Sequence, residues 1–140
     1  MYQGRFKSFP VQTDKHFLTV ARYVERNALR GKLVSLAEGW QWSSLWRRAQ
    51  GDVKLASWLS DWPVERPHDW LARVNRPQSA SELGSLRTSV QRGRPFGEEA
   101  WVRRLAKQFG MESSREIGAR NRFFPHAVVI TRGVARLTRA

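Results

Sequence analysis

The feature that most constrains the fold of this chain is an apolar stripe between residues 14 and 30. The stripe contains, in order, Phe17, Val20, Ala21, Val24 and Ala28. Their spacing of three or four residues is typical of one face of an amphipathic helix and predicts a helix over residues 14–30. Thr13 or Asp14 can cap its start, and Gly31 is a stop signal at its end.

Weaker patterns predict one element before this helix in the sequence and one after it. Residues 2–12 alternate in polarity and predict a half-buried strand that Pro10 closes. Ser43 can cap a brief helix that ends before Gly51. The prediction is a strand followed by two helices in the first part of the chain.

The second part of the chain is predicted to be helical up to about residue 110. A short helix is expected over residues 68–74, and the Ser79-x-x-Glu82 pattern opens another that runs to about residue 92. A further helix is expected over residues 97–108. From residue 111 onward periodicity fails, which predicts a disordered basic tail with one strand-like run at 127–131. The predicted fold class is mainly α with one N-terminal β-strand.

The charge of the chain points to a polyanionic partner. The 140 residues include 25 Lys and Arg against 12 Asp and Glu, a net charge of +13. Such an excess on a small chain is typical of nucleic-acid-binding proteins. Residues 71–140 hold 14 basic and 5 acidic side chains, so most of the excess lies in the second half.

Composition excludes several classes of protein. The chain has no Cys, which rules out disulfides, thiol enzymes and Cys-ligated zinc. No apolar run approaches the ~18 to 20 residues that a membrane span needs, and the first residues lack the apolar core of a signal peptide. A cytoplasmic location is expected, with association to the nucleoid if the protein binds DNA.

The polar face of the first helix carries a group of candidate functional residues. They are His16, Thr19, Tyr23, Arg26, Asn27 and Arg30. Cations beside a phenol favour its phenolate form, which a tyrosine nucleophile attacking phosphate needs. The alternative is that Tyr23 lies at the margin of the core and the arginines form a solvated face.

Two other groups have a functional and a structural interpretation. Residues 92–97 form a rigid basic turn, in which Arg92 and Arg94 precede a helix start suited to phosphate. Trp40, Trp42 and Trp46 can stack on unpaired bases. Burial in the core is the favoured interpretation of the tryptophans, with Trp42 and Trp46 packed against the first helix.

Five segments in order resemble the REP-associated tyrosine transposases, a branch of the HUH single-strand transposases. These segments are YQGRFKSFPV (2–11), RYVERNALR (22–30), WQWSSL (40–45), LRTSV (86–90) and RPFGEEAW (94–101). The resemblance covers about residues 2–110. It implies the C-terminal half of an α+β, ferredoxin-like transposase domain followed by a helical extension.

The resemblance also implies site residues and chemistry. Tyr23 matches the nucleophile that forms a 5′-phosphotyrosyl link and leaves a free 3′-OH. Asn27 matches a residue that helps a histidine pair to hold a divalent metal, Mg or Mn, at the scissile phosphate. The expected DNA contacts are Arg26, Arg30, Arg87, Arg92 and Arg94. The expected partner is single-stranded or hairpin DNA of a palindromic repeat, with no membrane.

One part of the family pattern is missing. The family has a His-hydrophobic-His pair, whereas His16, His68 and His126 are not spaced in this way. We therefore expect a truncated transposase-like chain that binds no metal and cleaves no DNA alone. Its expected organisation is a transposase-domain remnant over residues 1–50, a basic DNA-binding extension over 51–110 and the tail over 111–140.

Two further expectations follow from this interpretation. A non-catalytic DNA-binding module, or an inactive remnant of a mobile-element gene, is the alternative function. The N-terminal strand and the apolar stripe would lack partners within the chain, so a marginally stable monomer and self-association through the strand are expected.

Overall fold

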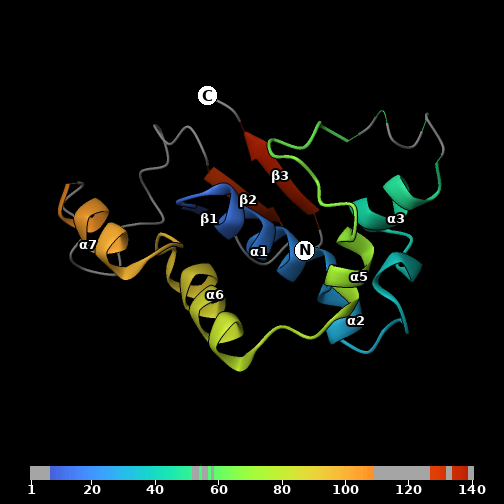
Figure 1. Cartoon of the computed structure of the whole chain (residues 1–140), viewed down its shortest axis with the longest axis horizontal. Helices are drawn as coiled ribbons and strands as arrows, with labels where there is room; N and C mark the ends of the chain where they lie inside the picture. Colours follow the sequence, from blue (N-terminus) through green and yellow to red (C-terminus); the bar gives the residue numbers. More distant parts are fainter. Residues whose placement is uncertain are drawn as a thin grey trace, which may run out of the picture.

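The computed structural model describes residues 7–51, 54, 57, 59–108, 127–131 and 134–138 (Figure 1). Its elements in chain order are β1 (Lys7–Pro10), α1 (Asp14–Glu25), α2 (Asn27–Arg30), the 3-10 helix η1 (Ala37–Gly39), α3 (Ser44–Ala49), α5 (Trp70–Asn75), α6 (Ala80–Arg92), α7 (Glu99–Gln108), β2 (Ala127–Thr131) and β3 (Val134–Thr138). The prediction of a mainly helical chain with an N-terminal strand is confirmed.

The strands form one antiparallel sheet in the order β1-β2-β3. Lys7 lies opposite Ile130 and Pro10 opposite Ala127, while Ala127 also lies opposite Thr138. The strand-like run at 127–131 is thus β2, and β3 is an addition that the sequence pattern did not predict. The sequence analysis expected the N-terminal strand to have no partner within the chain, whereas in the structure it pairs with β2. The rest of the predicted tail, like residues 2–6 of the predicted strand, lies outside the described residues.

The predicted helix over residues 14–30 is divided in two at Arg26. There the backbone has φ −80° and ψ −1°, which ends α1 and begins α2. The hydrogen bonding continues across the break, since Arg26 N–H donates to the Arg22 carbonyl and Arg30 N–H to the Arg26 carbonyl. The two short helices therefore present a nearly continuous face.

The predicted helix caps are confirmed. Thr13 accepts from the His16 N–H, and Ser43 accepts from the Trp46 N–H. Ser79 and Glu82 form a reciprocal capping box at the start of α6. These side chains satisfy N–H groups that have no partner inside the helix.

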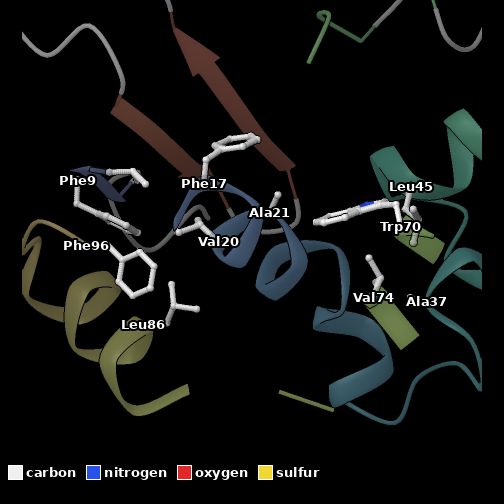
Figure 2. Packing of buried hydrophobic residues seen from close by; sticks show 11 residues of the cluster. Phe9, Phe17, Val20, Ala21, Ala37, Leu45, Trp70, Val74, Leu86 and Phe96 are labelled. Atoms are coloured by element: carbon white, nitrogen blue, oxygen red, sulfur yellow. The ribbon is translucent and has the colours of Figure 1, made fainter. Parts of the chain in front are cut away.

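The core lies around α1, which contacts α5 and β3, while α6 contacts β1 (Figure 1). Figure 2 shows Val20 near Phe9, Phe96 and Leu86 on one side. On the other side, Ala37, Leu45, Trp70 and Val74 gather at the end of the molecule formed by α3, η1 and α5. The buried cluster is thus built from segments throughout the described chain, with α1 between them.

The aromatic core differs from the prediction. Trp42 is 64% exposed, so its predicted burial against the first helix is wrong. Trp46 is half-buried. Instead, Trp70 is buried with its ring 5.0 Å from that of Trp62, which in turn lies 5.7 Å from Phe17. Both pairs meet edge to face, a favourable geometry for aromatic rings.

Candidate nucleic-acid interface

Tyr23, Asn27 and Arg30 form one side-chain cluster at the junction of α1 and α2. The Arg30 guanidinium carbon lies 4.1 Å from the centre of the Tyr23 ring, a cation–π distance. Arg30 Nη2 donates to Asn27 Oδ1 at 2.7 Å, and Arg30 Nη1 donates to the Tyr23 carbonyl oxygen at 3.3 Å. Tyr23 and Arg30 are half-buried, and Asn27 is exposed. The structure therefore brings together three residues that the sequence predicted for one site.

Arg26, another predicted site residue on this face, bonds to the end of α5, and Arg22 bonds to the two residues that follow α5. The acceptors are the carbonyl oxygens of Val74 and Asn75 for Arg26, and of Arg76 and Pro77 for Arg22, at 2.5 to 3.0 Å. Cations are favoured at the C-terminal end of a helix, where carbonyl groups lack helical partners. Burial, followed by the charges of Arg22 and Arg30, lowers the pKa of Arg26. Arg22 and Arg26 thus fasten α1 to α5, and contact of Arg26 with DNA stays a prediction.

Behind this face, Glu25 is a buried carboxylate that the sequence analysis missed. Trp70 Nε1 donates to its Oε2 at 2.6 Å, and Ser44 Oγ donates to its Oε1 at 3.1 Å. Burial raises the pKa of Glu25, and the two hydrogen bonds partly offset that rise. Its position between Ala21 and Ala28 on the buried face is the signal that could have found it.

The basic turn over residues 92–97 is fixed to the end of β1. Phe96 N–H donates to the Pro10 carbonyl at 2.8 Å, and Gln12 N–H donates to the Phe96 carbonyl at 3.1 Å. Gly93 ends α6 with φ 66°, a conformation that favours glycine. Gly93, Pro95 and Phe96 are buried while Arg92 and Arg94 are exposed. The turn therefore holds its arginines outward on a fixed backbone.

The residue that precedes α7 is held by a side-chain hydrogen bond. Gln12 Oε1 accepts from the Glu98 N–H at 2.6 Å. A Cβ atom on Gly97 would lie 2.5 Å from the same oxygen and 2.8 Å from a ring carbon of Trp101, so this close packing requires glycine. Glu98 and Glu99 also lie at this helix start, where their negative charge opposes a phosphate, and phosphate binding there stays a prediction.

His16 packs against the same turn. Its ring lies edge-on to Phe96 with 5.5 Å between ring centres, and its Nδ1 lies 2.8 Å from Thr13 Oγ1. Burial lowers the pKa of His16, while the charge of Glu98 acts in the opposite direction. His16 thus belongs to the packing of the turn and not to the cluster around Tyr23.

The predicted site residues fall into two separate groups. Arg87, Arg92 and Arg94 are exposed, and no hydrogen bond or ion pair joins their guanidinium groups to another described residue. Figure 1 shows the end of α6 and α7 on the side of the molecule opposite α2. The structure therefore does not bring these arginines together with Tyr23.

The described residues do not fit the divalent metal that the resemblance implies. Among them, no group of three or more His, Asp or Glu side chains is placed to hold a metal ion. Asn27, the one expected ligand, accepts a hydrogen bond from the Arg30 guanidinium through Oδ1. A cation bound to that oxygen would stand beside a like charge.

No protein-family model matches the chain, and neither a curated protein nor a solved structure is significantly similar to it. None of the helices in the described part of the chain is long and apolar enough to cross a membrane.

Proposed function

We propose that this chain binds DNA, and that it is a transposase-like protein of the REP-associated tyrosine type. Its proposed partner is single-stranded or hairpin DNA of a palindromic repeat. The proposed contacts are Arg87 on α6 and Arg92 and Arg94 at the turn. In a cell, such a protein would be associated with the nucleoid.

The observation that carries this proposal is the fixed basic turn. Arg92 and Arg94 are exposed, whereas Gly93 and Phe96 are buried and Phe96 is hydrogen bonded to Pro10. A fixed backbone needs no ordering when its arginines bind a ligand, and guanidinium groups pair bidentately with phosphate. The net charge of +13 supplies the long-range attraction.

Tyrosine-mediated single-strand cleavage is a second candidate function. It is favoured by the cluster in which the Arg30 guanidinium lies over the Tyr23 ring. Because the described residues do not fit the family metal, we expect no cleavage by this chain alone, as in a non-catalytic module or an inactive remnant. Incubation with a hairpin oligonucleotide and Mn²⁺ should give no covalent adduct. An adduct that Tyr23→Phe abolishes would contradict this expectation.

Fluorescence anisotropy with a labelled hairpin oligonucleotide tests DNA binding. Affinity should fall steeply with salt because bound counterions are released from the phosphates. The hairpin should also compete better than an unstructured oligonucleotide of the same length and composition. Salt-dependent binding without hairpin preference would mean that a basic surface attracts DNA without recognising the hairpin. Binding insensitive to salt would refute the proposal.

Self-association through β1 remains a proposal that size-exclusion chromatography can test. β1 pairs with β2 and lies at one edge of the sheet, where Phe96 bonds to its Pro10 end. An edge strand has backbone groups that a second copy can pair with. A monomer at all concentrations would refute it.

A further inference from the structure

The Arg30 guanidinium has hydrogen-bond donors beyond those that the fold uses. A guanidinium has five N–H donors. The described contacts use one on Nη2, to Asn27 Oδ1, and one on Nη1, to the Tyr23 carbonyl oxygen. These two bonds set the orientation of the group and leave other donors for a ligand.

The charge around Arg30 favours an anionic ligand. Arg22, Arg26 and Arg30 lie at successive turns of one face, and the charges of Arg22 and Arg30 both act on Arg26. Arg22 and Arg26 already bond to backbone carbonyls of residues 74–77. Arg30 bonds within its own segment, to the Tyr23 carbonyl and to the exposed Asn27. An anion at Arg30 would relieve the repulsion along this row of cations.

We infer that Asn27 is a positioning residue that holds the Arg30 guanidinium beside Tyr23, and that this cluster binds a DNA phosphodiester without a divalent metal. The inference rests on the proposed DNA binding. It differs from the metal-ligand role that the resemblance implies for Asn27, because the Oδ1 atom that would bind the metal accepts from Arg30 at 2.7 Å. A planar guanidinium offers the two parallel N–H donors that phosphate oxygens accept.

Asn27→Asp separates the two roles of this side chain. A carboxylate would be a better metal ligand than an amide, but it would also pair with Arg30 and neutralise its charge. We therefore expect Asn27→Asp to weaken binding of a labelled hairpin oligonucleotide about five- to tenfold, equally in EDTA and in Mn²⁺. Tighter binding by Asn27→Asp in Mn²⁺ would overturn the inference.

Three arginine variants complete this binding experiment. Arg30→Gln should weaken binding to a similar extent, and Arg30→Lys should restore it only in part because the planar fork is lost. Arg76→Gln removes the same charge from an exposed side chain and should change affinity less than about twofold. Equal losses in Arg30→Gln and Arg76→Gln would mean that only net charge matters and would overturn the inference.

Nitration of the tyrosine rings tests the positioning role without DNA. The chain has 2 Tyr, so mass spectrometry can compare nitration of Tyr23 with that of Tyr2 in one sample. The Arg30 guanidinium covers one face of the Tyr23 ring and disfavours attack there by an electrophile. Asn27→Ala should therefore release Arg30 and raise the ratio of Tyr23 to Tyr2 nitration, whereas Asn27→Asp should hold Arg30 in place and lower that ratio. An unchanged ratio in both variants would overturn the positioning role.

The two measurements also separate this inference from the proposed function. If the unaltered chain binds no hairpin DNA, the proposed function is wrong, and so is the proposal that the cluster binds a DNA phosphodiester. The nitration ratio then still decides whether Asn27 positions Arg30. Thermal unfolding of each variant shows whether a change in affinity or nitration comes from loss of the fold.

Discussion

Arginines at the two ends of this molecule have different roles. At the α1–α5 contact, Arg22 and Arg26 donate to backbone carbonyls of α5 and the residues after it. At the turn after α6, Arg92 and Arg94 are exposed. The same residue type therefore stabilises the fold at one end and is available to a ligand at the other. A net charge counts both groups equally, and only the contacts distinguish them.

The largest expected effect is on stability. Replacing Arg22 and Arg26 together by Ala should lower the free energy of unfolding by about 3 kcal/mol, since hydrogen bonds from charged groups are lost and helix-end carbonyls lose partners. Replacing Arg92 and Arg94 by Ala removes the same charge and should change it by less than about 0.5 kcal/mol. Urea unfolding followed by tryptophan fluorescence measures both. Equal losses would erase the distinction between the two ends.

Next in size is the effect of a methyl group at Gly97. Because an added Cβ would overlap Gln12 and Trp101, Gly97→Ala should lower the free energy of unfolding by about 2 kcal/mol. Gly84→Ala is the matched control, since nothing lies within 4 Å of a Cβ there and alanine favours the helix. Urea unfolding of the two variants should shift in opposite directions. A stable Gly97→Ala protein would show that the junction with α7 is loosely packed.

A smaller effect is expected on DNA affinity from the exposed arginines. Replacing Arg92 and Arg94 together by Gln should weaken hairpin binding about tenfold. It should also reduce the slope of log affinity against log salt concentration by about one to two units, since each phosphate contact contributes ~0.7 to 0.9. Anisotropy titrations at several salt concentrations measure both quantities. Lys15→Gln with Arg76→Gln removes as much charge from exposed positions and is the control. A slope that does not change in the Arg92 and Arg94 variant would place the DNA contacts elsewhere.

The smallest expected effect is a pH dependence from Glu25. Its pKa is raised in the folded state above the ordinary 4.5, so the folded protein binds the proton more tightly than the unfolded chain. The resulting stabilisation is present below pH 4.5 and is lost as the pH rises through the folded pKa. Glu25→Gln keeps an acceptor for Trp70 and should be slightly more stable than the unaltered protein at neutral pH, because it buries no charge.

Urea unfolding across a pH series measures the effect of Glu25. Glu25→Ala should be less stable than either protein at every pH because it leaves the buried Trp70 N–H without a partner. If the unaltered protein and Glu25→Gln show the same pH dependence, the carboxylate does not titrate as its burial indicates.

The sequence predicted the features that depend on neighbouring residues. Thr13, Ser43 and Ser79 cap their helices because each bonds an N–H group three residues on, and the Asp14 start follows from the apolar spacing. The break at Arg26 and the burial of Glu25 were not predicted. Both involve α5, whose residues lie more than forty positions away in the chain. Periodicity within one helix contains no information about such a partner.

The site was predicted in part for the same reason. Tyr23, Asn27 and Arg30 lie three, four and seven residues apart, so a helix alone brings them together. Whether Arg26 joins them depends on the carbonyl groups at the end of α5. The tryptophans show the same limit, because the spacing of Trp42 and Trp46 could not show that Trp62 and Trp70 fill the core instead.

The attachment of Phe96 to β1 has a consequence for how the protein opens. The Phe96 N–H and the Gln12 N–H close contacts between residues more than eighty positions apart in the chain. No local unwinding of α6 or α7 breaks these two bonds unless the turn also leaves β1. Amide hydrogen exchange at Phe96 and Gln12 therefore reports detachment of the turn from the end of β1, a motion that unwinding of either helix alone does not produce.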